Sequence, residues 1–154
     1  MKKVLFVSTS GGHLAQILQL SELFTLYEYL LVTEDDKSNY DLKDKYNVKF
    51  LSSTGEGRDY KFWKGFVINI IYALRIIYSF RPDVIITAGS HTAIPFCYIG
   101  KLFGAKIVYI LSYARRSTRA KSADIVYPIS DLFMVQWESA RLLYKNSKYV
   151  GGLY

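Results

Sequence analysis

The sequence predicts an α/β protein built on a Rossmann-like, doubly wound parallel sheet. Short apolar and β-branched runs alternate along the chain with segments of helical periodicity, the pattern of successive βαβ units. Turns rich in Gly, Ser and Thr follow two of these runs, at residues 8–13 and 87–92. Because no Pro- or Gly-rich linker divides the 154 residues, we expect a single domain over residues 1–154.

Seven strands are expected, each a short apolar or β-branched run typical of a strand buried on both faces. They are residues 3–7, 29–33, 48–52, 83–87, 106–111, 133–137 and 148–150. Helical spacing of apolar residues predicts helices over residues 13–26, 62–80 and 92–103. Only four apolar residues follow the basic start at Lys2 and Lys3, which is too short for a secretory signal. The cytoplasm is therefore the expected compartment.

Composition excludes several classes of protein. Apolar residues make up 51% of the chain and charged residues 21%, which excludes a disordered or low-complexity chain. Cys97 is the only cysteine, so an intrachain disulfide and a cysteine-based zinc site are excluded, and we expect no metal and no cofactor. The formal net charge of +7 indicates an anionic partner. A phosphorylated substrate or an acidic membrane surface is favoured over nucleic acid, for which the chain carries no motif.

The expected helix over residues 62–80 is apolar on nearly every side. Lys64 and Arg75 leave only ten uncharged residues between them, too few to span a bilayer. A helical wheel predicts a core face of Phe62, Phe66, Val67, Ile70, Ala73, Leu74 and Ile77. A helix that only covers a sheet would be polar on its other side. We therefore expect membrane or partner contact through Trp63, Ile68, Tyr72, Arg75 and Ile76. The alternative is a helix buried between the sheet and its neighbours.

Two glycine turns are candidates for binding an anion. In an open parallel sheet, ligands bind at the carboxyl ends of strands, and glycine lets the backbone approach a phosphate at a helix start. Neither turn is a dinucleotide fingerprint or a P-loop. The alternative is a pair of capped turns without a ligand. The residues predicted to bracket a diphosphate are Ser10, Gly11, Gly12 and His13 in the first turn and Gly89, Ser90 and His91 in the second.

A basic segment follows the fifth expected strand and should lie at the same sheet edge. Residues 112–122 carry Arg115, Arg116, Arg119 and Lys121, whose charges suit phosphate or lipid headgroups. The alternative is a solvated basic loop. His13 is the candidate general base, because the pKa of histidine lies near working pH.

Three motifs in this order resemble the asparagine-linked-glycosylation protein fourteen family, in the branch of bacterial glycosyltransferase enhancers of capsule and exopolysaccharide synthesis. They are Ser10-Gly11-Gly12-His13-Leu14, then Thr87-Ala88-Gly89 with Ile94-Pro95-Phe96, then residues 131–138 with Gly151-Gly152. The resemblance covers nearly the whole chain. It implies the acceptor-side, N-terminal half of a GT-B glycosyltransferase.

The resemblance also implies a non-catalytic subunit at the cytoplasmic face of the membrane. Such a subunit forms a heterodimer with a catalytic subunit that binds a UDP-sugar, and it helps to bind a polyprenyl-diphosphate-linked sugar acceptor. The two glycine turns, Arg115 and Arg116 would line the diphosphate site, with Trp137 and Glu138 near the partner or the cleft. Leu111, just before Ser112, stands where relatives often have a glutamate, so the carboxylate expected at this position is missing. The alternative is a stand-alone small α/β enzyme that binds a nucleotide or a sugar phosphate.

Overall fold

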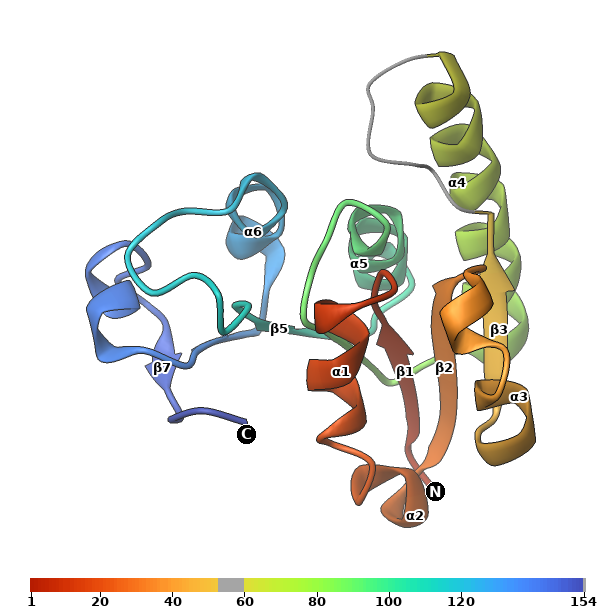
Figure 1. Cartoon of the computed structure of the whole chain (residues 1–154), viewed down its shortest axis with the longest axis horizontal. Coiled ribbons are helices and arrows are strands. Elements are labelled where there is room, and N and C mark those ends of the chain that lie inside the picture. Colours follow the sequence, from red (N-terminus) through yellow and green to blue (C-terminus); the bar gives the residue numbers. More distant parts are fainter. Residues whose placement is uncertain (53–59, 154) are drawn as a thin grey trace.

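The computed structural model describes residues 1–52 and 60–153, which form a sheet of seven parallel strands (Figure 1). The strands are β1 (Lys3–Val7), β2 (Glu28–Glu34), β3 (Val48–Leu51), β4 (Val84–Thr87), β5 (Lys106–Ile110), β6 (Leu132–Val135) and β7 (Lys148–Tyr149). Their order is β3-β2-β1-β4-β5-β6-β7, and every neighbouring pair is parallel. The predicted doubly wound fold is confirmed, and the strand order reverses between β1 and β4.

Helices connect the strands. They are α1 (Gly12–Leu18), α2 (Leu23–Leu26), α3 (Leu42–Lys45), α4 (Tyr60–Phe80), α5 (Ala93–Leu102) and α6 (Lys121–Val126), with short 3-10 turns η1 (Lys37–Asn39), η2 (Tyr127–Ile129) and η3 (Glu138–Leu142). The continuous helix predicted over residues 13–26 is wrong. After Leu18 the backbone tightens into three-residue turns, in which Leu20 N–H donates to the Ile17 carbonyl at 2.9 Å. The chain thereby changes direction before α2.

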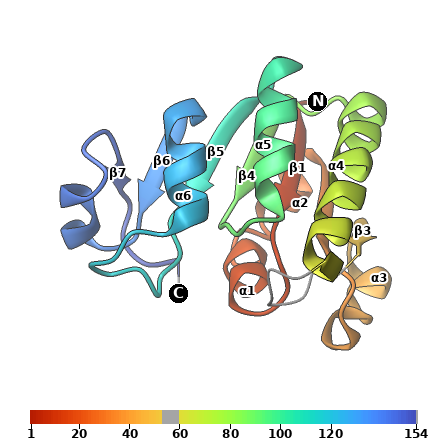
Figure 2. The same ribbon diagram turned by 90° about the horizontal axis from the view of Figure 1, so that it is seen from above.

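Two hydrophobic cores lie on opposite faces of the sheet. On one face α4, α5 and α6 lie side by side (Figure 2), over a core that includes Leu5, Ile77 and Phe96. On the other face α1 and α2 cover Phe6 and its neighbours on β1, β2 and β4. Cys97 is buried in the first core, where burial raises the pKa of its thiol to about 12. It serves as a packing residue, as its apolar surroundings in the sequence predict.

α4 packs in a different rotation from the one predicted. Ile76, expected to face outward, is only 4% exposed, whereas Val67 and Leu74, expected in the core, are 55% and 44% exposed. Apolar residues occur all round the helix, so periodicity did not determine which side packs. Asn69 marks the buried side, because its Nδ2 donates to the Ser52 carbonyl at 3.1 Å.

The outward side of α4 carries a continuous row of exposed apolar residues, here called the α4 stripe. Its members recur every three or four positions and so share one helical face. They are Tyr60, Trp63, Val67, Ile71, Leu74 and Tyr78. Within residues 1–52 and 60–153, no helix is long and apolar enough to cross a bilayer.

The α1 side of the sheet is covered only in part. Strand residues in the core beneath α1 come from β1 to β4, and neither core includes Val108, Ile110, Leu132 or Met134. The pairing of the strands aligns Phe6, Ile86, Val108 and Leu132 across β1, β4, β5 and β6. Their side chains therefore point to the same face of the sheet, the one that α1 covers. Val108, Leu132 and Met134 are half-buried. Ile110 is only 2% exposed, so we call the other three residues, Val108, Leu132 and Met134, the open sheet face.

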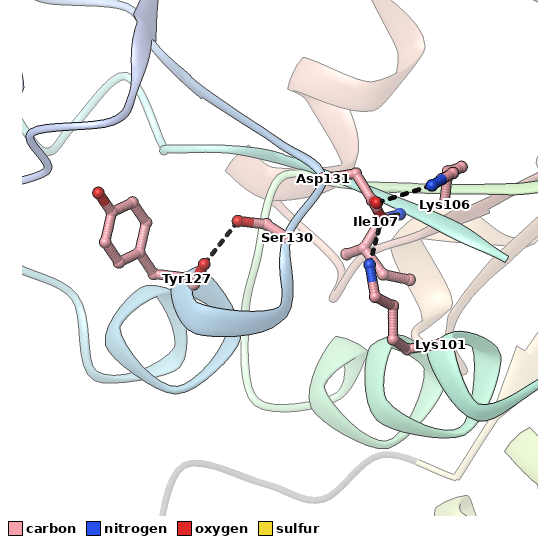
Figure 3. Close-up of polar contacts among 6 residues, drawn as sticks. All are labelled: Lys101, Lys106, Ile107, Tyr127, Ser130 and Asp131. Carbon is pink, nitrogen blue, oxygen red and sulfur yellow. Dashed lines mark hydrogen bonds and ion pairs between the residues drawn. The ribbon is translucent and has the colours of Figure 1, made fainter. Parts of the chain in front are cut away.

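Asp131 ties together the amino ends of β5 and β6 and the last turn of α5 (Figure 3). Its carboxylate accepts hydrogen bonds from Lys101 Nζ at 2.7 Å, Lys106 Nζ at 3.2 Å and Ile107 N–H at 2.8 Å. Burial raises the pKa of Asp131, but these three donors outweigh burial and hold the pKa at about 2.

Candidate functional site

A cavity of about 500 Å³ lies at the carboxyl edge of the sheet, where the loops after β1, β4 and β5 meet. We call it the carboxyl-edge cavity. These are the three loops that the sequence predicts at one edge. Its lining residues are His13, Ala88, Ser90, His91, Tyr109, Leu111, Ser112, Ala114, Arg115, Arg119, Ala120, Lys121 and Ser122.

His13 lies in the first turn of α1 and points across to the second loop. Its Nδ1 is 2.8 Å from the Ala88 carbonyl oxygen. Because a carbonyl can only accept, Nδ1 carries the proton and Nε2 is the unprotonated nitrogen of the neutral ring. Burial lowers the pKa of His13, the bond to Ala88 opposes this, and the charges of Arg115 and His91 lower the pKa further. The imidazole is therefore neutral at physiological pH and can accept a proton.

The first glycine turn precedes His13 and begins α1. Gly11 has φ +75°, a conformation that favours glycine. Apart from the chain neighbours and the α1 backbone, no described part of the chain would lie within 4 Å of a Cβ at Gly11 or Gly12. Among the described residues no side chain caps the start of α1, so the capped turn considered as the alternative is not formed there. Ser10, Gly11 and Gly12 lie next to His13 but are not among the residues that line the cavity.

The second glycine turn is shaped by its neighbours. Gly89 has φ +100°, and a Cβ there would lie 2.9 Å from Tyr109 Oη and 3.4 Å from His13 Cε1. Thr87 Oγ1 accepts a hydrogen bond from Gly89 N–H at 3.0 Å. Glycine is therefore required here by the close packing of His13 and Tyr109. The sequence alone suggested a different reason, namely close approach of an anion.

His91 lies in the second loop, beside a buried carboxylate at the end of β2. Its Nε2 is 3.8 Å from Glu34 Oε1, and Glu34, only 7% exposed, also accepts a 2.5 Å hydrogen bond from Thr92 Oγ1. The Phe62 ring of α4 lies 5.2 Å from the His91 ring, between centroids. These contacts place the amino end of α4 beside the cavity, and α4 projects past the sheet edge there (Figure 1).

The basic loop contributes three of its four cations to the cavity. Arg115, Arg119 and Lys121 line it, and no Asp or Glu does so in the described part of the chain. Arg119 is held by Asp124, 2.9 Å from its Nε. The fourth, Arg116, does not line the cavity, and its guanidinium lies 5.0 Å from the ring centroid of Trp137. The prediction that Arg116 binds the diphosphate therefore has no support from the lining of this cavity.

Tyr109 and Ser122 line the cavity although the sequence did not indicate either as a site residue. Tyr109 belongs to β5 and is almost fully buried, and its Oη lies 3.2 Å from Ser122 Oγ. Burial raises the pKa of the Tyr109 phenol, so it stays protonated. A tyrosine in a buried strand needs a hydrogen-bond partner for its hydroxyl. The presence of Tyr109 in an otherwise apolar run is therefore the signal in the sequence that could have indicated a polar site.

The segment over residues 131–138 supports the basic loop from outside the cavity. Gln136 is buried, and its Nε2 donates to Gln16 Oε1 at 2.7 Å and to the Leu111 carbonyl at 3.0 Å. Trp137 Nε1 donates to the Tyr113 carbonyl at 2.7 Å. Glu138 is the first residue of η3 and is exposed, and its Oε1 lies 3.5 Å from Arg141 Nη1. Trp137 and Glu138 therefore do not line the cavity.

The arrangement suits an anionic ligand. Three cationic side chains, two imidazoles and several hydroxyls surround a space of small-ligand size. Guanidinium and ammonium groups form charge-assisted hydrogen bonds with phosphate oxygens.

Known proteins resemble this chain over almost its whole length. Residues 4–153 match the family described as "Oligosaccharide biosynthesis protein Alg14 like". The UDP-N-acetylglucosamine transferase subunit ALG14 of Homo sapiens is 26% identical over 175 residues, covering 96% of this chain and 81% of the human protein. The subunit alg14 of Schizosaccharomyces pombe is 39% identical over 75 residues, covering 46% of this chain and 36% of the yeast protein.

Solved structures share the fold. MurG of Acinetobacter baumannii superposes with a TM-score of 0.73 at 14% identity, covering 90% of this chain and 43% of MurG. UDP-N-acetylglucosamine 2-epimerase of Rickettsia bellii also gives 0.73 at 16% identity, covering 99% of this chain and 45% of the epimerase. At these identities the likeness concerns the fold alone. The chain spans less than half the length of either protein.

Proposed function

The chain belongs to the Alg14 family, and from this membership we propose that it is a membrane-associated, non-catalytic subunit of a two-component glycosyltransferase. A separate catalytic subunit binds the UDP-sugar, and this chain binds the acceptor, a sugar linked to a polyprenyl diphosphate. The names of its relatives, subunits of a UDP-N-acetylglucosamine transferase, support the existence of a partner subunit. By its sequence resemblance to bacterial members, we assign the reaction to capsule or exopolysaccharide synthesis.

The observation that carries the proposal is the cationic carboxyl-edge cavity. Arg115, Arg119 and Lys121 face a space in which the described residues place no carboxylate. Two phosphates joined through oxygen present several acceptor oxygens and at least two negative charges, which these cations balance. The hydroxyls of Ser90 and Ser122 add neutral donors. We propose that this cavity binds the acceptor diphosphate, with the predicted turn at Gly11 and Gly12 beside it.

His13 is the group in this cavity that is best suited to accept a proton. Its ring is neutral, its Nδ1 is engaged with Ala88, and its Nε2 keeps a lone pair. An acceptor sugar hydroxyl must lose a proton as it attacks the donor sugar. We propose His13 as the general base candidate that this subunit, inactive alone, contributes to the complex, a role that typically contributes about 100- to 10,000-fold in rate.

The open sheet face supports a protein partner. Val108, Leu132 and Met134 lie on a side of the sheet that neither core cluster covers. A partner that packed there would remove this apolar surface from water, at roughly 25 cal/mol per Å². We propose that the catalytic subunit covers this face and forms a heterodimer, with Trp137 and Glu138 near its rim.

The α4 stripe supports contact with a membrane surface. Trp63, Val67 and Ile71 are each about half exposed, on a helix that also carries Lys64 and Arg75. Exposed aromatic and aliphatic residues flanked by basic ones are typical of helices that lie in the interface of a bilayer. The amino end of α4 contacts His91 through Phe62, so a bilayer at the stripe lies near the cavity. We propose peripheral binding at the cytoplasmic face.

Reconstitution tests the proposal. The chain and a candidate catalytic subunit are purified separately and together, and sugar transfer from a UDP-sugar to a polyprenyl-diphosphate acceptor is measured. Only the complex should be active. Arg115→Ala with Lys121→Ala should raise the KM for the acceptor and leave the KM for the UDP-sugar unchanged. Arg141→Ala with Lys145→Ala is the matched control, because both residues are exposed outside the cavity.

The rival function, a stand-alone small enzyme, makes the opposite prediction. The purified chain would then bind a nucleotide or a sugar phosphate in a calorimetric titration, or turn over a sugar donor without a partner. Transfer by the chain alone would refute the subunit assignment.

A further inference from the structure

A second cavity, of about 450 Å³, lies at the edge of the sheet between β3 and α4. We call it the β3–α4 groove. β3 is the outermost strand, so one side of the groove is the free edge of the sheet. The residues that line it are Lys43, Val48, Lys49, Phe50, Tyr72, Arg75, Ile76 and Ser79. None of them belongs to the carboxyl-edge cavity.

The charge of the groove is positive. Lys43, Lys49 and Arg75 line it, and within residues 1–52 and 60–153 none of the three lies within 4.0 Å of a carboxylate. Lys43 Nζ lies 5.1 Å from the Phe50 ring centroid. Three cations gathered without an acidic partner among the described residues repel one another, and an anion in the groove would relieve that repulsion.

The rest of the lining is mainly apolar. Val48, Phe50, Tyr72 and Ile76 contribute aliphatic and aromatic surface between the cations. A ligand that fits is therefore amphipathic, with a negative group beside the cations and hydrocarbon against the floor. The lysine and arginine side chains suit such a ligand, because their aliphatic parts pack along apolar surface while their charged ends stay in a polar environment.

The groove borders the α4 stripe. Arg75 of the groove lies one helical turn after Ile71 of the stripe, and residues four apart are neighbours on a helix surface. If the stripe enters the interface of a bilayer, the groove beside it is at the level of the lipid headgroups. A second copy of the chain is a poor occupant, because the lysines on this strand edge would face one another.

From these observations we propose that the β3–α4 groove is a binding site for the headgroup of an anionic phospholipid. The lipid phosphate contacts Lys43, Lys49 and Arg75, and the glycerol region lies against Phe50 and Tyr72. This inference rests on the proposed membrane association and adds to it a defined site and a class of lipid. It also predicts that the chain binds in one orientation, with the edge strand β3 beside the bilayer.

Flotation with two kinds of vesicle tests the site on the full chain. One kind is phosphatidylcholine alone, and the other also contains phosphatidylglycerol. The groove variant is Lys43→Gln with Lys49→Gln. The matched control is Lys145→Gln with Lys148→Gln, which removes two exposed lysines near β7, at the opposite edge of the sheet. Circular dichroism and thermal unfolding verify that both variants fold.

The groove variant should lose about 25-fold in partitioning onto phosphatidylglycerol vesicles, at about fivefold for each basic residue. It should keep the wild-type partitioning onto phosphatidylcholine, and the control should lose much less on either vesicle. Equal losses for the two double variants would mean only diffuse charge attraction and would overturn the site.

Two further outcomes separate this inference from the function proposed above. If the wild-type chain bound neither vesicle, membrane association itself would fail, and the site with it. If it bound both vesicles but the groove variant bound as tightly as wild type, only the site would fail. Sedimentation equilibrium tests whether a second copy of the chain occupies the groove instead. A dimer that the groove substitutions dissociate would assign the groove to that second copy and would overturn the lipid-binding proposal.

Discussion

The imidazole of His13 and the carbonyl of Ala88 join two glycine turns that lie 75 residues apart in the sequence, with 2.8 Å between Nδ1 and the carbonyl oxygen. One turn follows β1 and the other follows β4, the adjacent strands between which the strand order reverses. The bond fixes the tautomer of a buried histidine and holds the two loops at a set separation. A cavity that depends on both loops is therefore pre-formed.

The buried state of His13 predicts a pH dependence of stability. Burial lowers the pKa of His13 below its value in the unfolded chain, near 6.5. Between the two pKa values the unfolded chain binds more protons than the folded chain, so the free energy of unfolding decreases as pH falls below about 6.5. Urea unfolding at a series of pH values measures this. His13→Gln should flatten the profile in that range, and an unchanged profile would contradict the assignment.

Gly89→Ala should disturb the cavity more than it disturbs the fold. The added Cβ would meet Tyr109 Oη at 2.9 Å and lie close to His13, at a residue with φ +100°. We expect a loss of about 1–3 kcal/mol in the free energy of unfolding and weaker acceptor binding. Gly104→Ala is the control, since Gly104 has φ +89° but open space around it and should lose only about 1 kcal/mol. Similar binding defects in both variants would refute the packing argument.

Asp131→Asn should weaken the junction of α5, β5 and β6 (Figure 3). The carboxylate accepts from Lys101, Lys106 and Ile107, and an amide cannot replace its charge. Because the side chain is partly exposed, we expect a loss of about 1–2 kcal/mol. The folded pKa is about 2, below the unfolded value, so this stabilisation is full above about pH 4 and is lost as pH falls towards 2. Thermal unfolding at pH 3 and pH 7 tests both statements, with the exposed Asp44→Asn as control.

Gln136→Leu should loosen the basic loop. Gln136 donates to Gln16 and to the Leu111 carbonyl, and Gln16 in turn accepts a hydrogen bond from Tyr113 N–H at 3.0 Å. A leucine would remove the Gln136 donor from the Leu111 carbonyl and leave Gln16 Oε1 with the Tyr113 N–H alone, at about 1–3 kcal/mol. Hydrogen exchange at the Tyr113 amide should become faster. Exchange at wild-type rate would show that the loop is held by other contacts.

Most of the sheet was predictable from the sequence because its strands are buried on both faces. Runs such as residues 3–7 and 106–111 contain little besides apolar and β-branched residues, and their boundaries agree with β1 and β5 to within one residue. The rotation of α4 was not predictable, since the helix presents apolar residues to both the core and the outside. The tertiary contact of Asn69 with Ser52 marks the buried side, and it cannot be read from periodicity.

The site was predictable in outline, since topology alone brings loops after parallel strands to one edge. Side-chain direction was not. Arg116 directly follows Arg115 in the sequence, yet its guanidinium packs on the Trp137 ring and does not line the cavity. Tyr109 lies among the apolar residues of a strand, and Ser122 lies in the first turn of a helix, α6, that was not predicted because the segment before it is basic.

The corrected rotation of α4 changes which residues should bind a membrane. Val67→Glu with Ile71→Glu places two charges on the α4 stripe, and each apolar side chain lost from the interface should cost about 1.5–3 kcal/mol, at least a tenfold loss in partitioning onto vesicles for the pair. Leu142→Glu with Ile125→Glu is the matched control, because both residues are exposed but lie away from α4, and it should bind as wild type does. Ile76→Glu is not a surface variant: Ile76 is buried against the sheet, so an unpaired carboxylate there should unfold the chain. Flotation and thermal unfolding measured together separate these effects. If the stripe variant floated like wild type while Leu142→Glu with Ile125→Glu did not, the membrane-facing surface would lie near α6 and η3 instead.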